Sequence, residues 1–187
     1  MAEPVEPPYP ATLERSERRW AWVVAGVIAF MFAVIIYSGV HGAAAPPSNV
    51  ETVDASRLHL SGEFMEANLG TAVEADGSVV VRVLAEQYTF VPQCIVVPAA
   101  TRVVFRATSP DVVHGFLITD TNVNSMVVPG YVAEVHTRFE QPGEHLMPCH
   151  EYCSVGHEGM WARVKVLDRA EFDRLYRGQP RASCERQ

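Results

Sequence analysis

A short segment near the carboxyl end of the chain contains four side chains that suit a soft metal. Cys149, Cys153, His157 and Met160 follow one another in the pattern C-x3-C-x3-H-x2-M, directly before an apolar stretch. Thiolate and thioether sulfur are soft ligands, and imidazole binds copper and zinc well. The segment therefore indicates a site for a transition metal.

Several kinds of site compete at this segment. Cys149 and Cys153 could pair as a disulfide, although a bond across so short a loop stabilises little and needs no histidine or methionine beside it. Zinc suits two cysteines and two histidines but leaves Met160 unexplained. A single-copper electron-transfer site uses one cysteine, whereas two thiolates four residues apart can bridge two metals. The segment favours dinuclear copper, with zinc and the disulfide as open alternatives.

A further ligand must come from elsewhere in the chain, and His114 is the candidate. It lies in the segment Ser109–Phe116, at the expected edge of a strand. Taken alone, a histidine in an apolar strand is more often a structural residue than a ligand. Both interpretations of His114 are open at this point.

The elements that must position these residues are short and rich in valine, phenylalanine and threonine, as strands are. Proline and glycine residues separate them, which is typical of a sandwich or small barrel. The segment Arg169–Arg177 has apolar residues at helical spacing and ends before Gly178. We therefore expect a mainly β domain over residues 78–168 and a helix with a tail over residues 169–187. The expected strands are Ser78–Glu86, Thr101–Thr108, Val132–Glu140 and Met160–Leu167.

An uncharged stretch from Trp20 to Val40 is long enough to cross a membrane as a helix. Three arginines precede it and none follows closely, so the positive-inside rule places residues 1–19 in the cytoplasm and the rest outside. A cleaved signal peptide is the alternative, because Ala43–Ala45 resembles a cleavage site. The long apolar run and the acidic leader favour an uncleaved transmembrane helix over residues 20–41, followed by a linker over residues 42–77.

The net charge of the chain excludes one class of partner, and the two remaining cysteines are considered with it. The 187 residues include 22 acidic and 15 basic side chains, which gives a net charge of −7. Nucleic-acid binding needs clustered lysine and arginine, so no nucleic-acid partner is expected. Cys94 and Cys184 lie far apart, and we expect free or buried thiols there, because nothing specific favours a bond between them.

Taken together, these segments resemble subunit II of the haem-copper oxidases, whose exported cupredoxin domain carries the dinuclear CuA centre. The resemblance extends from about Ser78 to Leu167. It includes S-x-D-V-x-H-G-F around His114, a V-P-G-Y turn, the run R-F-E-Q-P-G-E and the whole cysteine segment. It implies a cupredoxin-like β-sandwich or barrel, anchored by one N-terminal transmembrane helix. A single helix is similar to the B family of these oxidases, and the absence of C-x-x-C-H indicates that no haem c is attached.

The resemblance also implies which residues bind copper. Cys149 and Cys153 correspond to the bridging thiolates, and His114 and Met160 to the terminal ligands of one copper. His157 corresponds to a ligand of the other copper.

The backbone carbonyl of Glu151 would complete the second copper site. In parts of the family the side chain at this position helps to bind magnesium at the interface with subunit I. Asp111, Phe116 and Trp161 are candidates for the wall that tunes the copper potential, and equally for ordinary structural packing.

The function that the resemblance implies is electron transfer in a respiratory oxidase. The chain would accept electrons from cytochrome c or a cupredoxin donor and pass them to haem in subunit I, which reduces oxygen. Tyr88 and Phe90 are expected where electrons enter, because Q-Y-T-F is similar to the aromatic Q-W-x-W motif of the family. An acidic exported domain would attract a basic cytochrome.

The implied location is a bacterial cell membrane, with the CuA domain on the periplasmic side. Two alternatives share the same sequence features. One is the CuA subunit of a nitric oxide reductase, and the other is a copper-binding carrier domain.

Overall fold

The computed structural model describes residues 11–41, 51–60, 62–176, 179 and 181–184. The chain divides into two units, Met1–Asn49 and Val50–Gln187, and each is considered by itself. Residues 1–10 of the expected leader and residues 42–50 of the expected linker lie outside the described residues.

The apolar stretch of the first unit forms helix α1 (Ala11–His41). Within its part from Glu14 to Val40, an 18-residue window has a mean hydropathy of 2.5 and contains no buried residue. This part is long and apolar enough to cross a membrane, as expected for a span of about 20 residues or more. The helix begins before the expected Trp20, because the glutamate and arginine residues ahead of it are also good helix formers.

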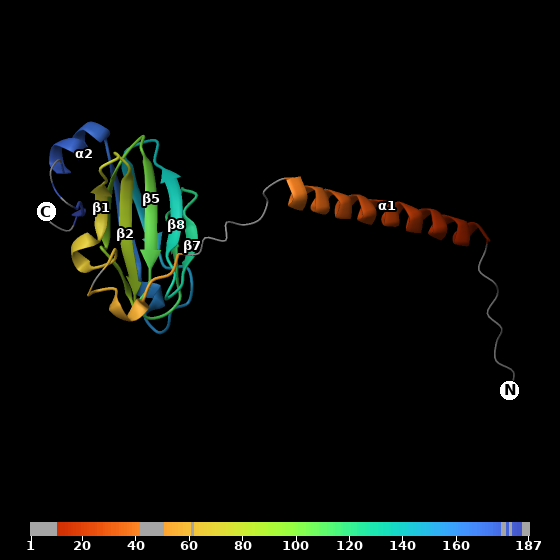
Figure 1. The fold of residues 1–187 in the computed structure, drawn as a ribbon, viewed down its shortest axis with the longest axis horizontal. Coiled ribbons are helices and arrows are strands. Elements are labelled where there is room, and N and C mark those ends of the chain that lie inside the picture. Colours follow the sequence, from red (N-terminus) through yellow and green to blue (C-terminus); the bar gives the residue numbers. More distant parts are fainter. Residues whose placement is uncertain (1–10, 42–50, 61, 177–178, 180, 185–187) are drawn as a thin grey trace. The chain divides into compact units, whose positions relative to one another are not determined.

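The second unit consists mainly of two sheets and a hairpin. The larger sheet has the order β1, β2, β5, β8, with β3 paired to β2, and Figure 1 shows its long strands side by side. The smaller sheet has the order β4, β10, β9, and β6 pairs with β7. The strands are β1 (Gly70–Val73), β2 (Val79–Glu86), β3 (Thr89–Val91), β4 (Cys94–Pro98), β5 (Arg102–Thr108), β6 (His114–Leu117), β7 (Asn124–Val127), β8 (Ala133–Arg138), β9 (Gly143–Pro148) and β10 (Trp161–Leu167).

One hydrophobic core joins the two sheets into a sandwich. Val81 and Phe105 enter it from β2 and β5, whereas Ile95 and Val164 enter it from β4 and β10, and all four are fully buried. Strand β10 alternates exposed and buried residues, so one of its faces is apolar and the other meets solvent. The predicted β-sandwich is confirmed, and the four predicted strands correspond to β2, β5, β8 and β10.

The part of the predicted linker that the structure describes is more ordered than the sequence indicated. It contains the short helices η1 (Ala55–Arg57) and η2 (Glu66–Asn68), and then strand β1, which pairs with β2. Leu58 and Phe64 of this segment are buried in a cluster with Leu84. The sequence hid this arrangement because β1 has only four residues and the two buried side chains follow no helical or strand period.

The carboxyl end of the chain closes one edge of the sandwich. Helix α2 (Arg169–Tyr176) confirms the predicted terminal helix and buries Phe172. Beyond it, Ala182 pairs with Thr71 of β1, and Ser183 pairs with Ile95 of β4. The tail therefore links an edge of the larger sheet to an edge of the smaller one.

A disulfide fastens this tail, and the prediction of free thiols at Cys94 and Cys184 was wrong. The two residues are bonded, with their Cα atoms 5.2 Å apart and 90 positions between them in the sequence. The bridge beside Ile95 brings the two cysteines together, and nothing in the local sequence around either residue reports a pairing over that distance.

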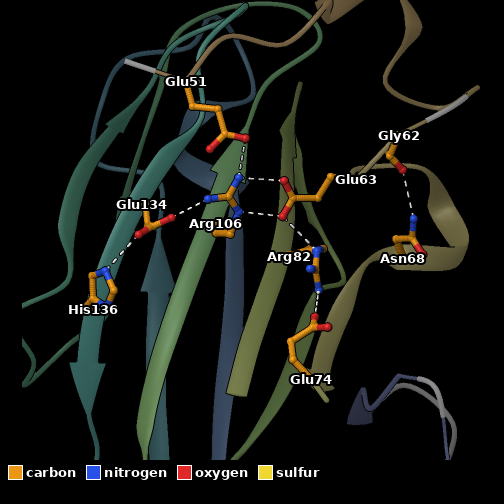
Figure 2. Close-up of polar contacts among 9 residues, drawn as sticks. All are labelled: Glu51, Gly62, Glu63, Asn68, Glu74, Arg82, Arg106, Glu134 and His136. Carbon is orange, nitrogen blue, oxygen red and sulfur yellow. Dashed lines mark hydrogen bonds and ion pairs between the residues drawn. The ribbon is translucent and has the colours of Figure 1, made fainter. Parts of the chain in front are cut away.

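A network of ion pairs lies on the outer surface of the larger sheet (Figure 2). The guanidinium of Arg106 on β5 contacts the carboxylates of Glu51, Glu63 and Glu134. Arg82 on β2 also contacts Glu63, at 2.9 Å. Because Glu51 and Glu63 belong to the segment before β1, the network holds that segment against the sheet.

Candidate metal centre

Two elements that are far apart in sequence supply the candidate ligands. His114 is the first residue of β6, and the cysteine segment connects β9 to β10. The backbone N–H of Cys149 donates to the carbonyl of Met160 at 3.0 Å, which closes the base of this loop. Cys149 also forms a bridge with Phe116 of β6, so the loop and the histidine strand are held side by side.

The two thiols lie next to each other at the centre of the site and are not bonded. Cys149 Sγ and Cys153 Sγ are 3.9 Å apart, and both residues are free and buried. A ring nitrogen of His114 lies within 4.8 Å of both sulfurs. Among the residues that the structure describes, these three make the one group of histidine, cysteine or acidic side chains whose ligand atoms are that close.

The other predicted ligands surround this pair of thiols. His114 Nδ1 is 3.9 Å from Cys149 Sγ, whereas the carbonyl oxygen of Glu151 is 3.2 Å from the same sulfur. Around Cys153 Sγ lie His157 Nδ1 at 3.7 Å and Met160 Sδ at 3.8 Å. The structure thus gathers the four other predicted donors around the two neighbouring sulfur atoms.

Asp111 fixes the orientation of the buried imidazole. His114 is fully buried, and its Nε2 lies 2.9 Å from Asp111 Oδ1. Burial opposes ionisation of Asp111, but hydrogen bonds from His114 and from the backbone N–H groups of Gln87 and Val112 hold its pKa below the usual 3.8. An ionised Asp111 accepts the Nε2 proton, which leaves the Nδ1 lone pair facing the thiols.

The thiol pair needs a positive partner before it can lose both protons. Burial, together with the charge of neighbouring Cys149, raises the pKa of Cys153 from 9.0 to about 11. Two adjacent buried thiolates therefore repel each other unless cations bind between or beside them.

The donor set fits copper better than the alternatives. Neither thiol is in a disulfide, while the two other cysteines are bonded to each other. A structural zinc site takes four ligands, which would leave part of this set unused. Two thiols, two imidazoles, a thioether and a carbonyl match the preference of copper for soft sulfur and imidazole ligands.

Tyr88 and Phe90, the aromatic residues predicted where electrons enter, have different environments. Tyr88 is 38% exposed, and a Cβ on Gly156 would lie only 2.6 Å from its Cγ, so its ring rests on the cysteine loop. Phe90 has no exposed surface and belongs to the core, so it cannot touch a donor protein. Its burial follows from strand alternation, because Phe90 is the central residue of β3 and points inward.

The structure adds contacts that the sequence analysis missed. The side chain of Gln87 donates to the carbonyl of Cys153 at 2.7 Å, although 66 positions separate them. Tyr152 and Val155 expose 73% and 82% of their surface on the cysteine loop. No local pattern in the sequence marks a hydrogen bond over such a separation. Tyr152 and Val155 lie within the cysteine segment, but their exposure is seen only in the structure.

The wall residues and the other histidines also have defined positions. Phe116 is fully buried, and Trp161 is half exposed with its Nε1 donating to the carbonyl of Glu158. His145 is half-buried and hydrogen-bonded to the carbonyl of Thr119. His136 and His150 are exposed, and the His150 ring lies where a side chain at position 115 would collide with it.

Comparisons with known proteins point to one family. Residues 66–167 match the family described as cytochrome c oxidase subunit II, periplasmic domain. A cytochrome c oxidase subunit 2 of Thermus thermophilus is 32% identical over 154 residues, which cover 81% of this chain and 92% of the relative. Another from the same species is 35% identical over 123 residues, covering 66% of this chain and 91% of the relative.

A solved structure extends the likeness to the fold. A chain from the cryo-EM structure of a heme-copper terminal oxidase dimer aligns with a TM-score of 0.52 and 24% identity, covering 81% of this chain and 99% of that one. Because the family model matches more than half of the chain and the first relative is 32% identical over most of it, the chain belongs to the cytochrome c oxidase subunit II family, and it is a subunit of a haem-copper oxidase.

Proposed function

We propose that this chain is the subunit at which electrons enter the oxidase, through a dinuclear CuA centre held by the cysteine loop and His114. The observation that carries the proposal is the pair of unbonded, buried thiols 3.9 Å apart with imidazole, thioether and carbonyl donors around them. Two coppers bound there would supply reversible one-electron transfer, with the electron shared across both thiolates.

The six candidate donors would have different roles in such a centre. Cys149 and Cys153 would bridge the metals, and His114 and Met160 would be terminal ligands of one copper. His157 and the carbonyl of Glu151 would be terminal ligands of the other. The buried surroundings exclude water from the thiols, and because no coordination position is needed for a substrate, the ligands can stay rigid.

The partners follow from the same site. Subunit I would receive the electrons, and its haem would reduce oxygen. The Glu151 side chain is half-buried beside the site, and a magnesium ion there would need further ligands from subunit I. The domain would lie on the periplasmic side, because arginines precede α1 and because the Cys94–Cys184 disulfide forms in an oxidising compartment.

The donor would dock over the cysteine loop, where Tyr88, Tyr152 and Val155 are exposed. Residues 46–187 contain 18 acidic and 12 basic side chains, so a basic cytochrome c would be attracted over a distance. Exposed aromatic residues contribute much of the binding energy in such interfaces.

We expect Tyr88→Ala to slow reduction by cytochrome c in stopped-flow experiments at every salt concentration, with the copper spectrum unchanged. Equal rates for both proteins would exclude Tyr88 from the docking site.

Metal analysis and electron paramagnetic resonance of the purified, copper-loaded full chain test the metal assignment. We expect two coppers per chain, a purple colour and a mixed-valence signal. Cys153→Ser should abolish that signal, whereas Met160→Leu should keep the copper but shift its potential, because a thioether is a weak ligand. Met126→Leu, at an exposed methionine on β7, is the matched control. One copper per chain, or preferential binding of zinc, would contradict the proposal.

A further inference from the structure

Gln87 connects the two segments that carry the candidate ligands. Its backbone N–H donates to Asp111 Oδ2 at 2.7 Å, and Asp111 Oδ1 holds the imidazole of His114. Its side-chain Nε2 donates to the carbonyl of Cys153 at 2.7 Å. Gln87, the residue directly after β2, thus bonds Asp111, which supports His114, and also bonds the cysteine loop.

The cysteine loop has few other attachments near its middle. Its base is closed by the hydrogen bond between Cys149 and Met160, and the turn within it by the bond from His157 N–H to the carbonyl of Ser154. Neither bond ties Cys153 to the strand that carries His114. Gln87 provides a connection, because its side-chain amide bonds the carbonyl of Cys153 and its backbone N–H bonds Asp111, three positions before His114.

The residue after Gln87 contacts the same loop. The ring of Tyr88 rests on Gly156, where even one added carbon would collide with it. The two consecutive residues therefore contact the loop at two points, and only the contact of Gln87 lies beside Cys153. A surface glutamine without a role in the site would not be expected to bond both Asp111 and Cys153.

We propose that Gln87 is a positioning residue that sets the placement of the Cys153 thiol relative to the His114 imidazole. The inference rests on the proposed copper site and names a residue that controls its geometry without binding the metal. Residues that orient metal ligands typically change metal affinity by about 10-fold to 100-fold when they are replaced. They also change the electronic structure of the site, because ligand angles and distances shift.

The test uses the full chain, loaded with copper, in three variants. Gln87→Met keeps the size of the side chain and removes its donor, and Gln87→Glu keeps the shape but places an acceptor against a carbonyl. Both Gln87 variants keep the backbone N–H that bonds Asp111. Gln93→Met is the matched control, because the amide of Gln93 donates to Thr89 Oγ1 on β3.

The expected result is a graded change in the copper site. Both Gln87 variants should alter the copper hyperfine pattern in electron paramagnetic resonance, shift the midpoint potential and release copper to a chelator about tenfold faster. The change should be larger for Gln87→Glu than for Gln87→Met, and absent for Gln93→Met. A mere loss of stability would not shift the potential of the copper that stays bound.

Two results would overturn the inference alone. One is a pair of Gln87 variants with the wild-type spectrum, potential and copper release, and the other is a Gln93→Met variant that changes as much as they do. The wild-type chain decides the proposed function in the same experiment. If it lacks a two-copper, mixed-valence signal, the proposed CuA centre itself is wrong.

Discussion

The orientation of the His114 ring in the metal site depends on its hydrogen bond to Asp111. The ring is fully buried, and its Nε2 is hydrogen-bonded to Asp111 Oδ1. An unpaired donor in such a place costs about 1–3 kcal/mol, so the ring has a strong preference for the orientation that the carboxylate allows. That orientation presents Nδ1 to the thiols.

Two substitutions of Asp111 distinguish the effect of its hydrogen bond to His114 from the effect of its charge. Asp111→Ala should leave Nε2 unpaired and weaken copper binding by about 10-fold to 100-fold, whereas Asp111→Asn, which keeps an acceptor oxygen, should weaken it far less. Titration of the full chain with copper against a competing chelator measures both effects. Equal losses in the two variants would show that the charge of Asp111 matters more than its hydrogen bond.

The sequence predicted the donors of the site better than the residues that support them. Cys149, Cys153, His157 and Met160 lie within twelve positions, so their spacing alone indicates a shared site. His114 needed the family resemblance, because the fold brings it from a different strand. Gln87 could not be predicted as a support, since its contact spans 66 positions and hydrogen bonding over that range leaves no local pattern.

At the scale of elements, the ion pairs around Arg106 attach the segment before β1 to the larger sheet. Burial of the Glu63 carboxyl opposes its ionisation, but Arg106 and Arg82 outweigh burial and hold its pKa below the usual 4.5. A carboxyl whose pKa is lowered by folding stabilises the fold above its unfolded pKa, and loses that contribution as the pH falls through the folded pKa.

Glu63→Gln should therefore lower the stability of the domain near neutral pH by about 1–2 kcal/mol, because hydrogen bonds to a charged partner weaken and the site is partly solvated. The difference between wild type and variant should shrink as the pH falls below about 4.5, where the unfolded wild-type carboxyl begins to bind a proton. Urea unfolding of the full chain in detergent, followed by near-ultraviolet circular dichroism, measures this. A difference that grows in acid would contradict the assigned role.

The elements themselves were predictable where proline and glycine bound an apolar run. Strands β2, β5, β8 and β10 and helix α2 are of this kind. Strand β1 and the Ala182–Ser183 tail were missed, because each is short and is stabilised by partners far away in sequence. Gly70 shows how specific the tail contact is, since a Cβ there would lie 2.9 Å from the carbonyl oxygen of Ala182.

At the scale of the whole molecule, the chain joins a helix that can cross a membrane to a domain with two kinds of cysteine pair. One pair is a disulfide that fastens the tail, and the other is a pair of free thiols suited to metal. A persistent disulfide is typical of an oxidising compartment, and there an empty thiol pair is exposed to oxidation. Copper would protect the second pair by occupying both sulfurs.

The only lysine in the sequence offers a direct test of the proposed orientation. Lys165 lies on β10 and is exposed, so its amine can react with a membrane-impermeant ester. If the domain faces the periplasm, intact spheroplasts should label Lys165 to the same extent as lysed cells, as measured by mass spectrometry of its peptide. Lys165→Arg keeps the charge and serves as the control for labelling elsewhere. Labelling of Lys165 that needs lysis would place the domain in the cytoplasm, where neither a stable disulfide nor a periplasmic electron donor would be expected.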